Sequence, residues 1–399
     1  MAHRSSKIAV VVPRYGLVGG GERFVYELTE RLADEPRFEC HVLANRWSEP
    51  SGRVVFHKMR RIGFPRFMSS WSFARSVDRY ITRNAFDLIH THERIFSADL
   101  FTMHSIPHPD WIRDVRKKRM SLYDRVLSRV ERQLIEYPGL RRILAVSSLA
   151  RDRLFDHFHS VTPPVDVVHP GIDIQRFDGI DRKACREDVR SRYGLGNDDT
   201  VVLFISMNFH IKGLDALMTA MARVCAAQPA SGLKLLVVGK GNHQAYQKLA
   251  KRLGVDQDVR FAGVWEKDIE RVYLAADLFA MLSRFDTFGL VVLEAMAASL
   301  PVIISPTVGA RDLVVNGENG FVVDRTDASA VAQRIETLLK PDIRESMARN
   351  ARKTAVACSW EKVAERTAGV YNMLLERPET AGQRSSSLAA DRNYGGIFR

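Results

Sequence analysis

The chain has 399 residues, of which 46% are hydrophobic, 27% charged and 9% aromatic. This length suffices for two or three domains that each bury a core, and the composition excludes a disordered, collagen-like or disulfide-stabilised chain. The net charge of +12 is uneven, with 28 basic against 19 acidic side chains in residues 1–170 and 31 against 28 in residues 171–399. The excess in the first half predicts an anionic partner: nucleic acid, a membrane surface or a phosphorylated substrate.

The cysteines and the apolar runs limit where the chain is expected to work. Four cysteines are widely spaced and form no Cys-x-x-Cys pair, which predicts a reduced cytoplasmic protein without a structural zinc site. The basic start is followed by an apolar run only from Ile8 to Val12, shorter than the about 7–15 residues of a secretory signal peptide. The longest apolar stretch, residues 290–304, is interrupted by Glu294 and Pro301 and is not expected to span a membrane.

Short β-rich runs alternate with helical periodicity along the chain. Strands are predicted at 7–12, 39–44, 53–58, 86–92, 99–104, 142–148, 165–170, 201–206, 233–239, 259–263, 277–282 and 301–305. Helices are predicted near 22–32, 70–82, 122–137, 182–193, 214–225, 245–253 and 290–298, with one more between the strands at 142–148 and 165–170. This alternation predicts an α/β fold with two doubly wound parallel sheets, one in residues 1–175 and one in 176–358. The Ser/Gly/Arg-rich tail, 378–399, is predicted to be disordered.

A glycine-rich loop follows the first strand and opens a helix. It runs from Gly16 to Arg23 and includes Gly19, Gly20 and Gly21. Glycines there let backbone N–H groups approach a ligand, and a helix N-terminus favours anions. The dinucleotide pattern G-x-G-x-x-G fails at this loop and again at Gly239–Gly241, so NAD binding is disfavoured. A tight strand-to-helix turn without a ligand is an equal alternative for this loop.

The segment from Asp286 to Ala297 carries the strongest chemical signal. Asp286 precedes Gly289 and a helix, and Glu294 follows eight residues after Asp286. At 1.5 Å per residue the two carboxylates are up to about 12 Å apart, too far for the about 5–5.5 Å pair of a retaining glycosidase. The spacing suits a long ligand held at both ends, with a diphosphate at the helix N-terminus. The spacing alone also allows an alternative, in which Asp286 caps the helix and Glu294 is a solvated helix residue.

This segment resembles the Glu-x7-Glu motif of retaining glycosyltransferases of family 4, which have two Rossmann-like domains (GT-B), with Asp286 in place of the first Glu. Other segments resemble the same family in order and spacing: Val168–Phe177, Phe204–Gly213, Val308–Gly320 and the Gly19–Arg23 loop. The resemblance covers nearly all of residues 7–376 and is nearest to lipopolysaccharide core heptose glucosyltransferases. It implies two domains facing a central cleft, with acceptor binding in residues 1–175, nucleotide-sugar binding in 176–358 and a C-terminal helix, 360–376, returning to the first domain.

The resemblance also implies a role for particular residues. Lys212 would neutralise the donor diphosphate, Glu294 would accept the ribose hydroxyls, and Asp286 would hold sugar hydroxyls near the reacting carbon. His104 matches a histidine that hydrogen-bonds the donor sugar, whereas His90 and His92 are interpreted as structural. Met207 occupies a position where many relatives have arginine, so Asn208 or His210 would contribute to phosphate binding. The catalytic set is Lys212, Asp286, Glu294 and His104, and the donor set adds Asn208, His210, Phe288, Gly289, Leu290 and Val291. Gly19, Gly20 and Gly21 would form the acceptor-side loop.

The reaction implied is retaining transfer of a hexose, with UDP-glucose as the favoured donor, to a saccharide or lipid-linked saccharide such as lipopolysaccharide core. No Asp-x-Asp pair follows a predicted strand, so a metal-independent enzyme is predicted, and no cofactor is expected because the nucleotide sugar is a substrate. A nucleotide-sugar epimerase or another enzyme of the same fold is the alternative. A nucleic-acid-binding protein ranks third, because no binding module is recognisable.

Residues 111–142 concentrate the positive charge of the first half. They hold ten basic and four acidic side chains interleaved with apolar ones, the composition of a basic amphipathic helix that lies on anionic lipid. The alternative is a solvated helix packed on the sheet. The resemblance to core transferases implies a membrane-contacting region at this place, so we expect peripheral attachment to the inner face of the cytoplasmic membrane, with contacts from Arg113, Arg116, Lys117, Lys118 and Arg119.

Overall fold

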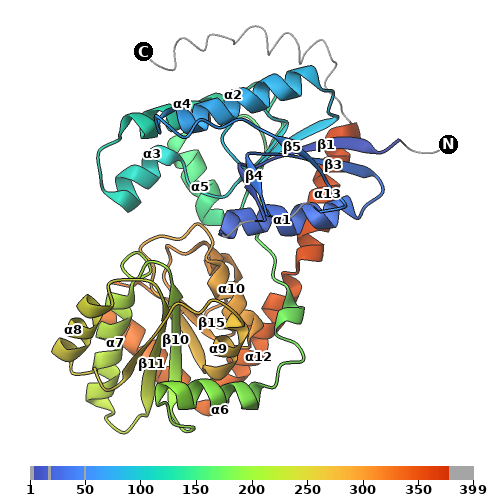
Figure 1. Ribbon diagram of the computed structural model, residues 1–399. Helices are drawn as coiled ribbons and strands as arrows, with labels where there is room; N and C mark the ends of the chain where they lie inside the picture. Colours follow the sequence, from blue (N-terminus) through green and yellow to red (C-terminus); the bar gives the residue numbers. More distant parts are fainter. Residues whose placement is uncertain (1–3, 17–18, 49–50, 377–399) are drawn as a thin grey trace. The chain divides into compact units, whose positions relative to one another are not determined.

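The computed structural model describes residues 4–16, 19–48 and 51–376 and divides into two compact units (Figure 1). The first unit comprises Met1–Gly171 and Trp360–Arg399, and the second comprises Ile172–Ser359. The division falls a few residues before the boundary predicted at 175/176. The tail predicted to be disordered, 378–399, lies outside the described residues.

A seven-stranded parallel sheet forms the centre of the first unit, in the order β5-β3-β1-β6-β7-β8-β9. Its strands are β1 (Ser6–Val11), β3 (Phe38–Ala44), β5 (Val55–Lys58), β6 (Leu88–Thr91), β7 (Leu100–Met103), β8 (Arg142–Ala145) and β9 (Val165–Val167). A short parallel pair, β2 (Arg14–Tyr15) and β4 (Arg46–Trp47), follows β1 and β3. The helices are α1 (Gly20–Ala33), α2 (Met68–Arg83), α3 (His108–Asp110), α4 (Leu122–Ile135) and α5 (Ser148–His157).

The C-terminal helix α13 (Trp360–Glu376) belongs to the first unit, as the resemblance implies. Arg31 on α1 donates to Glu361 at 2.8 Å, and the Tyr371 hydroxyl is 2.7 Å from Nδ1 of His90 on β6. Gly171 lies so close to Trp360 that an added Cβ would come within 2.7 Å of its backbone. The last helix is therefore fastened to the first unit by contacts on α1, on β6 and at Gly171.

The second unit has a six-stranded parallel sheet in the order β12-β11-β10-β13-β14-β15. Its strands are β10 (Thr200–Ser206), β11 (Leu233–Gly239), β12 (Val259–Gly263), β13 (Leu278–Met281), β14 (Val302–Ile304) and β15 (Gly320–Val322). Its helices are α6 (Arg182–Tyr193), α7 (Leu214–Ala227), α8 (His243–Leu253), α9 (Ile269–Ala275), α10 (Leu290–Ala297), α11 (Ala328–Leu339) and α12 (Pro341–Ala357). Of these, α9, α11 and α12 were not among the predicted elements.

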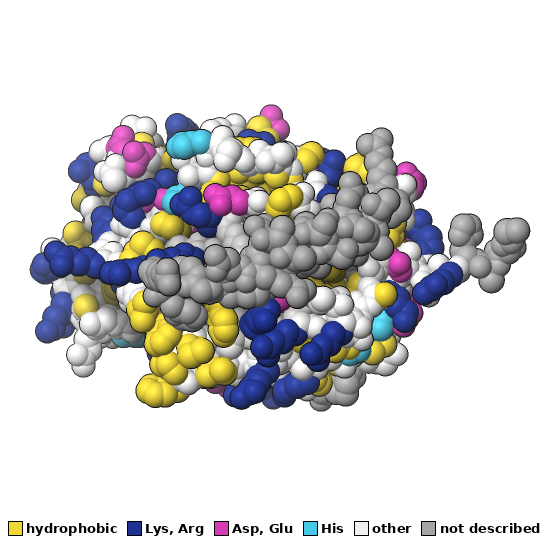
Figure 2. Space-filling view, turned by 90° about the horizontal axis from the view of Figure 1, so that it is seen from above, with side chains coloured by type: hydrophobic (Ala, Val, Ile, Leu, Met, Phe, Trp, Pro, Cys, Tyr) yellow, Lys and Arg dark blue, Asp and Glu magenta, His cyan; other side chains and the backbone are white. Residues whose placement is uncertain are grey.

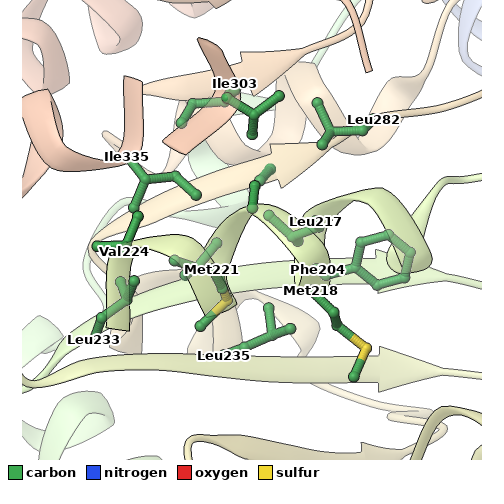
Figure 3. Close-up of a cluster of buried hydrophobic side chains, with 14 of the residues drawn as sticks. Phe204, Leu217, Met218, Met221, Val224, Leu233, Leu235, Leu282, Ile303 and Ile335 are labelled. Atoms are coloured by element: carbon green, nitrogen blue, oxygen red, sulfur yellow. The ribbon is translucent and has the colours of Figure 1, made fainter. Parts of the chain in front are cut away.

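Helix α7 shows why this unit packs as it does. Leu214, Leu217, Met221 and Val224 recur at helical spacing and are fully buried, which forms one apolar stripe. Figure 3 shows this stripe lying on the side chains of β10 and β11, with Ile335 of α11 beside it. Each such side chain contributes about 1.5–3 kcal/mol by leaving water. The continuous apolar runs of β10 and β11 reflect a sheet covered on both faces.

A buried arginine connects α6 to the same sheet. Arg190 is 1% exposed, and its guanidinium donates to Asp277 at 2.7 Å and to the backbone oxygens of Ala275, Gly196, Asn197 and Asp199. Asp277 also accepts from the backbone N–H of Val201 at 2.7 Å. Burial lowers the pKa of Arg190, and the Asp277 carboxylate opposes that shift. The network ties the helix to the start of β10 and the approach to β13.

The expectation of one amphipathic interfacial helix over 111–142 is wrong. A π-helical turn ends at Arg116, Lys117 has a left-handed backbone (φ 48°), and α4 begins only at Leu122. Most apolar side chains of α4, among them Val126 and Val130, are buried, whereas Leu122 at the start of the helix is 51% exposed. The buried side chains pack in the core of the first unit, so they cannot contact a lipid surface.

Within the described ranges, no helix is both long and apolar enough to cross a bilayer.

Candidate active site

The chain reverses its path across the second sheet between β10 and β13. Strands β11 and β12 lie on one side of β10, and β13, β14 and β15 lie on the other. Ligands of α/β proteins bind outside the carboxyl ends of strands at such a switch point. The two loops that leave this edge, 207–213 after β10 and 282–289 after β13, contain most of the predicted donor residues.

These two loops are joined by hydrogen bonds. The Ser283 hydroxyl donates to the backbone oxygen of Ile211 at 3.0 Å, and the Arg284 N–H donates to the same oxygen at 2.7 Å. Gly213 caps α7 at φ 77°, and an added Cβ there would lie 1.8 Å from the Leu282 oxygen. Only glycine allows this close approach, and the approach sets the place of Lys212 immediately before it.

Lys212 and Asp286 meet across the joined loops. The Lys212 ammonium forms an ion pair with Oδ2 of Asp286, and both side chains are about four-fifths buried. The Asp286 backbone is held on both sides, because its N–H donates to Thr307 at 2.9 Å and its oxygen accepts from Gly309 at 3.0 Å. A cation and a carboxylate are therefore in contact at the carboxyl ends of β10 and β13.

Helix α10 starts beside this pair. Gly289, at φ 90°, is its N-cap, and no side chain caps the helix. The first N–H groups of a helix have no partner within it, so those of Leu290 and Val291 and that of Gly289 are candidate donors to an anion. Phe288 is buried. Its N–H donates to Oδ1 of Asp286 at 3.3 Å, which connects the carboxylate to the helix start.

Glu294 lies one turn into α10 and is held by other residues of the second unit. The Tyr273 hydroxyl donates to its Oε2 at 2.8 Å, and Arg176 is 3.4 Å from its Oε1. Arg176 also pairs with Glu270. Burial, followed by the Glu294 carboxylate, raises the pKa of Tyr273 well above its usual value, so the hydroxyl stays protonated. Glu294 is thus an anchored carboxylate and not a solvated helix residue.

Asn208 and His210 have different surroundings. Oδ1 of Asn208 accepts from the Ile211 N–H at 3.0 Å, so this side chain shapes the loop itself. His210 is exposed and contributes its backbone oxygen to Arg284 at 3.1 Å. Met207 is 67% exposed at the same edge. No contact of the Asn208 or His210 side chain distinguishes either as a phosphate ligand.

The first unit has its own pocket at the carboxyl ends of β1, β6 and β7. Its volume is about 330 Å³, and its lining includes Arg14, Gly21, Glu22, Arg61, His92 and His104. Nε2 of His104 is 3.0 Å from Nδ1 of His92. A Cβ added at Gly21 would lie 3.6 Å from the His104 ring. Gly20 and Gly21 form the first turn of α1 and Gly19 its N-cap, so the predicted acceptor-side glycines lie at a helix start beside His104.

Three histidine rings lie next to one another at this pocket: His92 and His104, which line it, are stacked, and the His90 ring is tilted against that of His92. Burial lowers the pKa of His104 to about 4, that of His90 to about 3, and that of His92 well below its usual value. His90 contacts the hydroxyls of Tyr371 and Thr102, each at 2.7 Å, which fits its structural interpretation. Nε2 of His92 is buried without a hydrogen-bond partner among the described residues. At neutral pH all three rings are uncharged.

These histidines predict an acid-sensitive first unit. Their pKa values are lower in the folded chain than in the unfolded chain, where histidine titrates near 6.5. As pH falls below about 6.5 the unfolded chain therefore binds more protons, and stability is lost towards pH 4. His104 alone contributes on the order of 3 kcal/mol to this loss.

Thermal unfolding between pH 7 and pH 4.5 measures the effect. His104→Gln is expected to flatten the pH dependence of the melting temperature. His159→Gln, at an exposed histidine, is expected to leave it unchanged. Equal slopes for wild type and His104→Gln would contradict the assignment.

Two family models match the chain, and each matched segment lies almost entirely within one of the two units. Residues 18–176 match Glycosyltransferase Family 4, and residues 186–354 match Glycosyl transferases group 1. Solved structures agree in fold. A crystal structure of WaaG, described as a glycosyltransferase involved in lipopolysaccharide biosynthesis, has a TM-score of 0.73 at 19% identity, covering 91% of this chain and 99% of WaaG. Sucrose-phosphate synthase from Thermosynechococcus elongatus has a TM-score of 0.73 at 22% identity, covering 93% and 99%. The fold is therefore that of the GT-B glycosyltransferases.

Relatives found by sequence carry the same class of name. D-inositol 3-phosphate glycosyltransferase of Streptomyces avermitilis is 32% identical over 245 residues, 59% of this chain and 52% of that protein. A glycosyltransferase of Methanocaldococcus jannaschii is 26% identical over 337 residues, 81% of this chain and 85% of that protein. The chain thus spans about half the length of the inositol phosphate enzymes that it matches.

Proposed function

We propose that this protein transfers a hexose, with retention of configuration, from a nucleotide sugar to a saccharide or lipid-linked saccharide. The observation that carries the proposal is the meeting of Lys212 and Asp286 beside the uncapped start of α10, which also holds the anchored Glu294. A cation and free N–H groups suit a diphosphate, and a carboxylate further along the helix suits ribose hydroxyls.

Charge stabilisation is the main contribution of these residues. When the bond from the sugar to the diphosphate breaks, negative charge grows on the leaving phosphate, and Lys212 with the α10 N–H groups would stabilise it. In the structure Lys212 is paired with Asp286. A bound diphosphate would attract the ammonium and leave the Asp286 carboxylate able to accept sugar hydroxyls.

The remaining parts of the reaction follow the resemblance. Same-face attack assisted by the leaving phosphate would give retention, and His104, in the first unit, would hydrogen-bond the donor sugar as a neutral ring. The acceptor would bind the first unit and the donor the second. We propose transfer without a metal or cofactor, since the diphosphate charge would be met by Lys212 and the α10 N–H groups.

UDP-glucose is the proposed donor. The fold neighbours include Anabaena HepE, whose structure was solved in complex with UDP-glucose (TM-score 0.69, 19% identity, covering 92% of this chain and all of that one). For the acceptor, lipopolysaccharide core is the first candidate. The names of the sequence relatives favour a second, an inositol phosphate. Both belong in one acceptor panel with UDP-glucose as donor.

Replacing Glu294 tests the donor site. Glu294→Gln is expected to weaken binding of UDP by about 10–100-fold, because charge-assisted hydrogen bonds to ribose become neutral ones. Titration calorimetry with UDP measures the change. Glu187→Gln, at an exposed glutamate of α6, should bind UDP like wild type. Equal affinity of Glu294→Gln and wild type would remove Glu294 from the donor site.

The same preparation separates the functional classes. Stabilisation by UDP but not by short DNA favours a nucleotide-sugar enzyme over a nucleic-acid binder. Release of UDP from UDP-glucose only when an acceptor is present favours transfer, and conversion of the donor sugar without acceptor favours the epimerase.

Peripheral membrane attachment at the cytoplasmic face is also proposed, on a smaller surface than one helix would provide. Arg113, Arg116, Lys117, Lys118 and Arg119 are all exposed. Arg113 pairs with Asp110 and Asp114, and Lys118 is 3.5 Å from Asp124. Within the described ranges, Arg116, Lys117 and Arg119 have no hydrogen bond or ion pair through their side chains. These three cations support attraction to anionic lipid.

A further inference from the structure

A groove runs along α2 on the first unit, apart from the pocket beside His104 and from residues 111–119. Its volume is about 340 Å³. Arg60, Arg75, Arg79 and Arg83 line it together with Trp71 and Tyr80. We name it the arginine groove. None of the residues assigned above to donor, acceptor or membrane contacts lines it.

The positions of the arginines on α2 lower the stability of that helix. Arg75, Arg79 and Arg83 follow one another at four-residue spacing, about 6 Å along one side of the helix. Like charges at this spacing destabilise a helix. Arg75 is paired with the buried Asp78 at 3.0 Å. In the described part of the chain the guanidinium groups of Arg60, Arg79 and Arg83 have neither a hydrogen bond nor an ion pair. Three uncompensated cations therefore line one cavity.

The charge and shape of the groove favour a phosphate monoester. Such a group carries about −1.5 to −2 charges near neutral pH and offers three acceptor oxygens, and guanidinium groups bind phosphate through two parallel hydrogen bonds. A diester carries a single charge, which would leave more of the guanidinium charge uncompensated.

Apolar side chains on the same unit favour a lipid as the carrier of that phosphate. Phe64 is 89% exposed and Leu122 is 51% exposed, and Ile62 and Trp71 contribute apolar lining to the groove. Figure 2 looks onto α2 and α4 and shows dark blue Lys and Arg side chains in separate groups beside yellow apolar ones. A lipid offers hydrocarbon that can contact such apolar side chains at a membrane surface, and a soluble phosphate ester does not.

We propose that the arginine groove binds the phosphate-monoester headgroup of an anionic lipid. This goes beyond sugar transfer, and it adds a headgroup preference to the general attraction proposed for residues 111–119.

Vesicle binding tests the groove with a charge-matched control. The probes are phosphatidylcholine vesicles containing phosphatidic acid, a monoester, or phosphatidylglycerol, a diester, adjusted to equal surface charge. Wild type is expected to prefer phosphatidic acid. Arg79→Gln/Arg83→Gln is expected to lose about 30-fold in partitioning to those vesicles and to lose the preference. Lys248→Gln/Lys251→Gln removes two exposed charges from α8 of the second unit and is expected to change partitioning less than twofold.

Three results would overturn the proposal. The first is an arginine variant that loses no more binding than the lysine variant, and the second is one that loses equally on both vesicle types. The third is glycerol 3-phosphate binding as tightly as the vesicles, which would assign the groove to a soluble ester. UDP binding and the melting temperature of the arginine variant should equal those of wild type. They report separately on the proposed sugar transfer and on folding.

Discussion

Lys212→Met is expected to lower kcat/KM for sugar transfer by about 10²–10³-fold, the cost of removing one preorganised group that stabilises developing charge. Methionine keeps the length of the side chain and its apolar stem but cannot neutralise a phosphate. The loss should fall mainly on kcat, because the charge on the leaving diphosphate is greatest in the transition state.

Release of UDP from UDP-glucose in the presence of acceptor measures this loss. Lys248→Met, at an exposed lysine of α8, is the control for loss of a positive charge and should retain wild-type kcat/KM. Lys212 pairs with Asp286, so the melting temperature of Lys212→Met must be recorded as well. A folded Lys212→Met protein with nearly wild-type kcat would remove Lys212 from the proposed site.

Arg190→Met is expected to destabilise the second unit by about 3–5 kcal/mol, the usual cost of breaking a buried ion pair by removing one partner. The variant leaves Asp277 with Arg186 at 2.8 Å and the Val201 N–H, while the backbone oxygens of Ala275, Gly196, Asn197 and Asp199 lose the Arg190 donor. Ala275 is buried, so the loss of this hydrogen bond at its oxygen adds to the destabilisation.

Urea unfolding followed by circular dichroism measures the change in stability. Arg192→Met lies two residues away on the same helix, where the exposed Arg192 stacks over Trp265 at 5.1 Å. That variant should lose less than about 1 kcal/mol, within the range of an exposed cation–π contact. Similar unfolding midpoints for the two variants would show that the Arg190 network does not hold α6 to the sheet.

The alternation of strands and helices was recognisable from local patterns. Strands such as β10 and β11 are continuous apolar runs because both faces of a parallel sheet are covered, and α7 is amphipathic because one side lies on that sheet. Helix α9 was missed because it has only seven residues, and α12 because only Met347, Ala351 and Ala355 along its length are buried. Short or weakly amphipathic helices leave little periodicity to detect.

For the basic segment, residues 111–142, the sequence pattern predicted one interfacial helix that the structure does not contain. Basic and apolar residues alternate in 111–142, and that pattern is shared by a membrane helix and by a helix packed on a core. Val126 and Val130 are buried, which shows that this side of α4 packs on the core. The left-handed Lys117 interrupts the segment before it.

The sequence by itself determined the class of fold, the basic first half and the candidate residues Lys212, Asp286 and Glu294, because strand patterns and short motifs are local properties of the chain. Only the tertiary structure decided what these residues contact. Lys212 and Asp286 are 74 positions apart, and Tyr273, which holds Glu294, has no motif of its own. The arginine groove likewise depends on which cations remain unpaired after folding. Such pairings depend on how distant segments pack, and no local pattern encodes that.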